Sequence, residues 1–456
     1  MPSYFLLSSE PSMPHSDEIS LLSEWIAKMR SGEVPAELVA AKSGIAAQYD
    51  RFAEIMRGDA PPRIYGVNTL PGHREGEPMP AGYAASYQRN LIENHCLPQT
   101  EFVDAETARF IHLSKCRTIA SGGSLISPDL YEILLDLAGD PGFAPDIPKG
   151  ATYSSGDVIP AAYWARAVLT HRPEYELKPG EGMALINGAF IHIGTALAAF
   201  ARLVQVWDSY LTVSRRFFAH VPANDALLIH AAPNRVAAAQ SYVIEPSEFP
   251  PPGSLQPPVS VRAFPQTLLA FHDSIAGLAK QILLTLSQPS SNPRIGQTDQ
   301  GEARILPSGT FVAPGLSLAT GQVIDSLLMV GWTIVRRMEF FLSGEVAGIA
   351  RDGTDPTDPI GLIQWPKLAV AELESMRMLY SRRVFGSGGA TSYGVEDFWT
   401  HGTLTAHQMM ACAETLETIL GLEHEIQDRA GRSEPGRINR RADAGTATVP
   451  SSARLV

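Results

Sequence analysis

Apolar residues recur along much of the chain at steps of three and four positions, which is the spacing of one face of an α-helix. Segments 130–137 and 407–422 show this pattern, whereas continuous strand-like alternation is scarce. The clearest case is the apolar series Leu268, Phe271, Ile275, Leu278, Ile282 and Leu286. The chain is therefore predicted to be an all-α, or mainly α-helical, protein.

Two apolar stretches, Ile186 to Trp207 and Leu316 to Leu342, approach the length of a membrane-spanning helix. Both contain polar or charged residues that a lipid bilayer accepts only at a cost. These residues are Asn187, His192 and Arg202 in the first stretch, and Asp325, Arg336 and Arg337 in the second. Both stretches are predicted to be buried helices of a large bundle, and no membrane is expected as a partner.

Four segments rich in proline and glycine separate the helical ones: 61–72, 141–160, 245–265 and 386–394. Such residues fix the backbone of loops on a rigid helical frame, where catalytic groups commonly lie. From about Arg429 the chain becomes polar and rich in small residues. The expected organisation is an N-terminal helical segment (1–60), a main helical domain (61–428) and a polar, disordered tail (429–456).

The composition is 45% hydrophobic and 18% charged, a balance typical of a well-buried enzyme or obligate oligomer. The net charge of −12 comes without a basic stripe, so nucleic acid and anionic membranes are poor candidate partners. Three widely spaced cysteines, Cys96, Cys116 and Cys412, indicate neither a disulfide framework nor a zinc site. The first residues lack the pattern of a signal peptide. A cytoplasmic protein without a metal site is therefore expected.

One proline-bracketed loop, KGATYSSGDVIP at residues 149–160, can make a chemical group from its own backbone. In a tightly compressed turn, the nitrogen of Gly156 can attack the carbonyl carbon of Ser154, and water is lost. Loss of a second water from Ser155 leaves a methylidene-imidazolone, a built-in electrophile. Glycine suits this step because its nitrogen is unhindered and its backbone can adopt strained angles. The structural alternative is that Ser155 or Asp157 caps the following helix.

The same loop resembles the G-S-V-G-A-S-G-D-L-A-P motif of histidine, phenylalanine and tyrosine ammonia-lyases and the related aminomutases. Five more segments, spread over about residues 60 to 420, resemble motifs of that family in the same order. They are IYGVNT (64–69), YQRNLIENH (87–95), EGMALINGAF (181–190), SVRAFPQ (260–266) and TSYGVEDFWTHGT (391–403).

The resemblance implies a fold, a reaction and a cofactor. The fold would be a long up-and-down helical bundle with catalytic loops at one end, assembled as a homotetramer whose sites each draw loops from three subunits. The reaction would be loss of ammonia from an α-amino acid, or migration of its amino group. The electrophile would be the methylidene-imidazolone made from Ser154, Ser155 and Gly156, with no external cofactor and no metal.

The resemblance also assigns roles to five side chains. Tyr65 would remove the β-proton, Asn187 would orient the electrophile and bind substrate, and Glu396 would handle the amino group or a proton. Arg262 would clamp the substrate carboxylate through two parallel hydrogen bonds, and His95 would contact a polar ring of the substrate. Each has a structural alternative: Tyr65 as a buried loop tyrosine, Asn187 as a helix cap and Glu396 as a solvated carboxylate. For Arg262 the alternative is a surface ion pair, and for His95 a histidine satisfied by its own helix.

The sequence departs from the family pattern at several positions. Ser154 stands where alanine is usual, Tyr153 replaces a glycine, and Val259 stands where a second catalytic tyrosine is usual. Segments 70–72, 310–312 and 394–395 also differ, and several amides that would position a substrate are missing. One such hydrogen-bond donor can contribute about 3 kcal/mol to stabilising a transition state.

Three functional hypotheses follow from the pattern and its departures. The first is an ammonia-lyase or aminomutase acting on histidine or a related amino acid. The second is a repurposed enzyme of specialised metabolism, with or without the ring, that acts on a different carboxylate substrate. The third is a non-catalytic binding relative, against which the joint presence of Tyr65, Asn187, Arg262 and Glu396 argues. Histidine, phenylalanine and tyrosine are expected to be poor substrates, with histidine the least poor.

Overall fold

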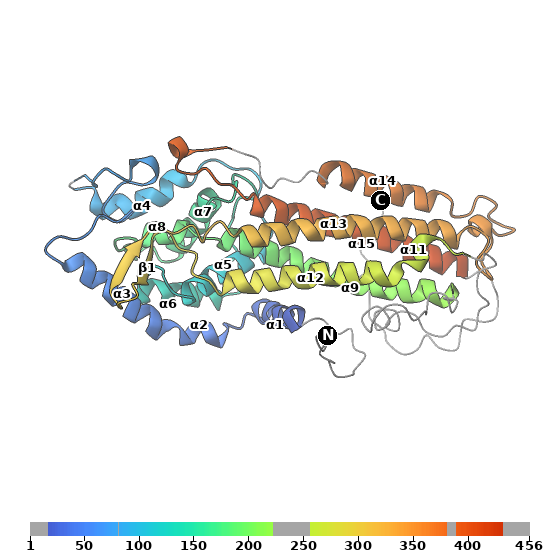
Figure 1. Ribbon diagram of the computed structural model, residues 1–456, viewed down its shortest axis with the longest axis horizontal. Coiled ribbons are helices and arrows are strands. Elements are labelled where there is room, and N and C mark those ends of the chain that lie inside the picture. The colour runs from blue at the N-terminus through green and yellow to red at the C-terminus, as the bar shows by residue number, and fades with distance from the viewer. Residues whose placement is uncertain (1–16, 81, 222–255, 381–388, 432–456) are drawn as a thin grey trace, which may run out of the picture.

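The computed structural model of the 456-residue chain describes residues 17–80, 82–221, 256–380 and 389–431. Long helices run side by side along the molecule (Figure 1). They are α5 (Ala105–Ala120), α9 (Phe190–His220), α12 (Phe264–Leu286), α13 (Pro314–Phe341) and α15 (Gly402–Gly431). The prediction of a mainly α-helical chain is confirmed.

Shorter elements lie at the ends and along the sides of these helices. Within the described ranges the two strands, β1 (Arg294–Gln297) and β2 (Ala303–Leu306), form an antiparallel hairpin. The shorter α-helices are α1 (Asp17–Ser31), α2 (Ala36–Ala40), α3 (Lys42–Arg57), α4 (Ala84–His95), α6 (Pro128–Ala138), α7 (Val158–His171), α8 (Glu181–Ile186), α11 (Val259–Arg262) and α14 (Gln364–Tyr380). The 3-10 turns are η1 (Gly72–Arg74), η2 (Arg351–Gly353) and η3 (Ser392–Gly394).

The apolar periodicity of the sequence places the core. All six residues of the apolar series between Leu268 and Leu286 are buried on one face of α12. Burying one such side chain contributes about 1.5–3 kcal/mol relative to leaving it exposed. Pro265 lies in the first turn of α12, where the missing N–H would have no helical partner in any case. The helices expected at 130–137 and 407–422 are present as α6 and α15.

The direction of the long helices follows from contacts near their ends. Phe218, at the end of α9, packs against Phe264, at the start of α12, with ring centroids 4.7 Å apart. Arg337 of α13 forms a fully buried ion pair with Glu423 of α15, at 2.6 Å. Helices α9, α13 and α15 therefore run in one direction and α12 runs in the opposite one, as in the expected up-and-down bundle.

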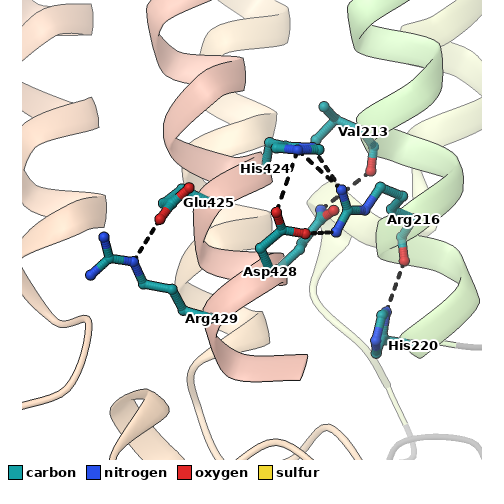
Figure 2. A network of polar contacts seen from close by, with 8 residues as sticks. Val213, Arg216, His220, His424, Glu425, Asp428 and Arg429 are labelled. Atoms are coloured by element: carbon teal, nitrogen blue, oxygen red, sulfur yellow. Dashed lines mark hydrogen bonds and ion pairs between the residues drawn. The ribbon is translucent and has the colours of Figure 1, made fainter. Parts of the chain in front are cut away.

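Polar contacts join the C-terminal ends of α9 and α15 (Figure 2). One guanidinium nitrogen of Arg216 lies 2.9 Å from Nδ1 of His424, and another donates to the carboxylate of Asp428. Arg429 and Glu425 form a separate pair on α15, at 2.7 Å, with both side chains largely exposed. These contacts stabilise the end of the bundle at which α9 and α15 terminate.

Two helical segments, Glu181–His220 and Pro314–Phe341, are long and apolar enough to cross a membrane by length and composition. The apolar window of the first is wholly buried inside the protein, as expected for a bundle helix, and that of the second is half buried. The division of the chain near residues 60 and 428 stays a prediction. Residues 432–456 of the expected tail lie outside the described residues.

Candidate active site

The loop before α7 has a backbone that is unusual for residues other than glycine. Ser154, Gly156 and Asp157 have φ angles of +57°, +99° and +49°. A left-handed conformation costs a non-glycine residue about 1–2 kcal/mol, and it persists only where the surroundings enforce it. Two non-glycine residues with positive φ, Ser154 and Asp157, therefore flank the bend at residues 154–156.

The start of α15 holds this loop in place. The backbone nitrogen of Thr403 donates to Oγ of Ser154 at 2.9 Å, and the hydroxyl of Thr400 donates to the Ser154 carbonyl at 3.3 Å. Ser154 and Gly156 are buried, whereas Ser155 is only half-buried. Ser155 is therefore the member of the tripeptide with an accessible side chain.

Asp157 closes the loop from the other side. Asp157 is the N-cap residue of α7, which was one structural alternative for it, but its side chain makes no capping hydrogen bond. Its carboxylate instead accepts hydrogen bonds from the hydroxyls of Thr152 and Thr403, the latter at 3.1 Å. Burial raises the pKa of Asp157, and these hydrogen bonds oppose the rise.

Asn187 follows the last residue of α8 and lies beside the tripeptide. Its Nδ2 is 3.5 Å from the position that a β-carbon on Gly156 would take. Its Oδ1 is buried and has no hydrogen-bond partner among the described residues. The Asn187 carbonyl accepts a hydrogen bond at 2.8 Å from Nζ of Lys115, a buried residue of α5 that also donates to Ala184. A buried cation thus fixes the end of α8 next to Gly156.

Tyr65 and Glu396 come from two loops that contact one another through η1 and η3. The phenol oxygen of Tyr65 accepts a hydrogen bond from the Gly72 nitrogen at 3.2 Å. Burial raises the pKa of Tyr65, and the negative charge of Glu396 raises it further. Oε2 of Glu396 accepts a hydrogen bond at 2.6 Å from the hydroxyl of Tyr153, which directly precedes the tripeptide. The structure therefore brings Tyr65, Glu396, Asn187 and the tripeptide to one end of the bundle.

His95 is the last residue of α4, and its ring makes a local contact. Nδ1 of His95 lies 2.7 Å from the Leu91 carbonyl of the same helix, and the side chain is half-buried. This hydrogen bond is the one expected for a histidine satisfied by its own helix. The predicted contact between His95 and a substrate ring stays a prediction.

Arg262 lies far from the other predicted site residues of its own chain. It ends α11, where Nε donates to the Pro257 carbonyl at 2.9 Å and the side chain is exposed. Two residues later, Phe264 packs at the far end of α9, whereas Asn187 precedes the start of α9. Helix α9 has 31 residues and is about 45 Å long. Figure 1 shows α11 at the opposite end of the bundle from α7 and α8.

The N-termini of four helices surround the loop. Helix α7 continues it, α9 begins after Asn187, and α15 begins beside Thr403. Helix α13 begins two residues after Val312, whose carbonyl accepts a hydrogen bond from Thr400 at 3.0 Å. A helix N-terminus carries a partial positive charge, so this region favours negative charge on a bound molecule. Among the described residues no group of three or more histidine, cysteine, aspartate or glutamate side chains could hold a metal ion.

The sequence reasoning did not single out several residues that build this site. Lys115 lies in a helix that also carries Glu106, Arg109, His112 and Arg117, so the sequence does not mark it as the lysine that is buried, although lysine is almost never fully buried. Thr403 is the last residue of the segment TSYGVEDFWTHGT, and the resemblance assigned it no role. Tyr153 stood out only as a departure from glycine, because its partner Glu396 is 243 residues away in the sequence.

Comparisons with known proteins identify the family and the fold of the chain. The model of the family "aromatic amino acid lyase" matches residues 22–175 and 171–432. A histidine ammonia-lyase of Deinococcus radiodurans is 26% identical over 437 residues, which cover 88% of this chain and 82% of the relative. The ergothioneine-degrading enzyme ergothionase from Treponema denticola has a TM-score of 0.76 at 17% identity, covering 91% of this chain and 88% of that structure. Phenylalanine aminomutase of Pantoea agglomerans has a TM-score of 0.74 at 19% identity, covering 89% and 87%.

The structural similarities confirm the expected fold, and the family match extends from α1 through α15. Sequence identities this low leave the substrate open. The expected enzyme class is supported by the family match and by the histidine ammonia-lyase relative together. The chain belongs to the aromatic amino acid lyase family and is a carbon–nitrogen lyase or aminomutase.

Proposed function

We propose that this enzyme carries a methylidene-imidazolone made from Ser154, Ser155 and Gly156, and that it removes or moves the amino group of an amino acid. The observation that carries the proposal is the run of positive φ angles at positions 154, 156 and 157, within the segment in which the ring would close. The accessible side chain of Ser155 also fits a ring at this place, as does the amide oxygen of Asn187, which has no hydrogen-bond partner in the described part of the chain. No external cofactor is proposed.

The ring would supply an electrophilic carbon. Residues around it would bind the substrate and transfer its protons. Tyr65 would take the β-proton on its phenol oxygen. Its raised pKa keeps the phenol protonated at rest, so Tyr65 must first release its own proton to solvent before it takes the β-proton. A positive charge nearby, such as the substrate ammonium, favours that release. The Gly72 nitrogen donates to the same oxygen and favours the phenolate. Glu396 would handle the amino group through a hydrogen bond to its carboxylate, or would take up a proton.

Arg262 would bind the substrate carboxylate in the site of another copy, because in its own chain it lies at the far end of α9. We propose a homotetramer, in the cytoplasm, with α12 and α13 at the interfaces. Half of the apolar window of α13 is not buried in the single chain, and Leu318 of α13 and Leu284 of α12 are 55% and 46% exposed. Large obligate interfaces cover apolar faces of this kind.

The substrate proposed first is histidine or a related amino acid, as the histidine ammonia-lyase relatives suggest. A second candidate is an amino acid or related carboxylate with a polar side chain of different shape. Tyr153 favours it, because its ring and hydroxyl occupy a place where the resemblance has glycine. A site that hydrogen-bonds its substrate discriminates strongly when such groups change. Free histidine, phenylalanine and tyrosine would then all be poor substrates.

Intact mass spectrometry of the purified chain tests the ring directly. The wild type should weigh two water molecules less than its sequence, and Ser155→Ala should abolish both that loss and turnover. An unmodified peptide 149–160 in active protein would refute the ring. Assays of ammonia and unsaturated acid with histidine, phenylalanine and tyrosine test the substrate. Turnover of any of them at about 1–10 per second would refute the second candidate.

A further inference from the structure

Tyr153 is fastened to segment 396–401 at three points. Its carbonyl accepts a hydrogen bond from the His401 nitrogen at 3.0 Å, and its ring packs against Trp399 with centroids 4.6 Å apart. Its hydroxyl donates to Oε2 of Glu396 at 2.6 Å. The indole nitrogen of Trp399 also donates to the Glu396 carbonyl, at 3.1 Å. The phenol can leave Glu396 only if these contacts rearrange.

Glu396 receives two hydroxyl groups on one oxygen. Thr391 donates to Oε2 at 2.6 Å, the same oxygen that Tyr153 reaches, and the two hydroxyl oxygens lie 2.9 Å apart. The backbones of Thr391 and Glu396 exchange hydrogen bonds of 3.1 and 3.3 Å. Burial and the charge of Glu396 raise the pKa of Tyr153, so its hydroxyl remains a donor at neutral pH. No described residue donates a hydrogen bond to Oε1, which stays available to a ligand.

We infer that Tyr153 is a positioning residue for Glu396: with Thr391 it fixes Oε2 and leaves Oε1 for the substrate. The inference rests on the proposed function, which gives Glu396 its contact with substrate. Because Tyr153 is bonded to Ser154 in the chain, the same contact keeps Glu396 at a constant separation from the tripeptide. It also brings a phenol into the site of a chain that has Val259 where a second catalytic tyrosine is usual.

A variant can separate the positioning of Glu396 by the Tyr153 hydroxyl from a purely structural role of that hydroxyl in the loop. The loop 152–157 is independently held by Thr400 and Thr403, whose hydrogen bonds go to Ser154 and Asp157. Phenylalanine at position 153 would keep the ring packing on Trp399 and the backbone contact with His401. Tyr153→Phe therefore removes the contact with Glu396 and spares the fold of the loop.

The test compares four variants of the full-length protein with the wild type. Tyr153→Phe and Thr391→Val each remove one hydroxyl from Glu396, and Thr391→Ser keeps it. The matched control is Tyr163→Phe, which removes a tyrosine hydroxyl that donates to the Leu97 carbonyl at 2.7 Å, outside the site. Hydrogen–deuterium exchange of a peptide covering residues 389–401 measures how firmly Tyr153 and Thr391 hold the segment around Glu396, and it needs no substrate. Intact mass reports the ring, and assays with histidine, phenylalanine and tyrosine report kcat and KM.

The expected result is exchange about tenfold faster at residues 391–396 in Tyr153→Phe and Thr391→Val, with an unchanged intact mass. For whichever amino acid the wild type converts, kcat should fall about 10- to 100-fold with little change in KM. Thr391→Ser and Tyr163→Phe should resemble the wild type. Unchanged exchange in Tyr153→Phe overturns the inference even if no amino acid of the panel is converted. Faster exchange with unchanged kcat overturns it too, and loss of the ring in Tyr153→Phe would give that residue a different role. A wild type that lacks the ring refutes the proposed function by a separate measurement.

Discussion

The carbonyl oxygen of Asn187 accepts a hydrogen bond from the buried ammonium group of Lys115 at 2.8 Å. Lys115 also donates to the Ala184 carbonyl at 2.5 Å and lies over the ring of Phe190, 4.4 Å from its centroid. These contacts satisfy the ammonium without a carboxylate, and burial lowers its pKa to about 7. The end of α8, and with it the amide beside Gly156, is therefore held by an amino group whose charged form is costly to bury.

The first prediction concerns Lys115 and pH. The pKa of Lys115 is about 7 in the folded protein, below its ordinary 10.5. Between these values the unfolded chain binds more protons, so the stability of the wild type should rise with pH, by up to about 1.4 kcal/mol per unit. Lys115→Met should lack this part of the rise. Urea denaturation of both proteins from pH 7 to 9 measures the difference, and parallel curves would contradict the assignment.

A second prediction concerns the backbone at Gly156. A methyl group there would meet Asn187 and Phe311 at 3.5 and 3.7 Å, which are ordinary contacts, so Gly156→Ala should fold. Its φ of +99° is unfavourable for alanine, and relaxation of this angle would move the Gly156 nitrogen relative to the Ser154 carbonyl. Intact mass should therefore show little or no loss of water. Gly150→Ala is the matched control, since a β-carbon there meets nothing within 4 Å, and it should keep the wild-type mass.

The helices and the loop were predictable from local patterns, but the contacts around the loop were not. The spacing from Leu268 to Leu286 is enough to predict α12, because burial of one helix face depends on sequence period alone. Asp157 looked like a helix cap because a sequence does not reveal φ angles. Tyr153 and Glu396 lie 243 residues apart, and no local rule joins residues at that separation.

The position of Arg262 in the fold could not be predicted from the sequence, for a different reason. The family resemblance predicted its role, but the position of α11 at the far end of the bundle depends on the direction of α9 and α12. That direction is set by contacts such as the one between Phe218 and Phe264. A site that needs residues from both ends of the bundle requires more than one copy of the chain.

A third prediction compares two ion pairs to which α15 contributes the carboxylate. Arg337 donates to both carboxylate oxygens of Glu423, at 3.0 and 2.6 Å, and both side chains are fully buried. Glu423→Gln should leave Arg337 as an uncompensated buried charge and cost about 3–5 kcal/mol. Glu425→Gln removes the exposed partner of Arg429 and should cost at most about 1 kcal/mol. Chemical denaturation measures both, and equal costs would contradict the burial of the first pair.

A fourth prediction concerns the chemistry of Arg262. If it binds a carboxylate through two parallel hydrogen bonds, Arg262→Lys should raise KM strongly, because an ammonium group cannot reproduce the planar fork. The variant should retain its ring mass, since Arg262 lies at the other end of the bundle from Ser155. Steady-state kinetics with the best amino acid of the panel measure the effect. Unchanged KM and kcat would remove Arg262 from the site.

The last prediction asks whether sites are shared between copies. Arg262→Ala and Ser155→Ala should each abolish turnover when made alone, the first through lost substrate binding and the second through the lost ring. When the two chains are co-expressed with different tags and the hybrids are purified, random mixing puts an intact Ser155 beside an intact Arg262 of another copy in about a quarter of the sites. Those sites should restore about a quarter of wild-type activity. If each site were built within one chain, every site would carry one of the two substitutions, and the hybrids would be inactive. A hybrid of Arg262→Ala with Arg262→Lys controls for assembly, because none of its sites contains Arg262. Its activity should not exceed the activity that the Arg262→Lys chains contribute by themselves.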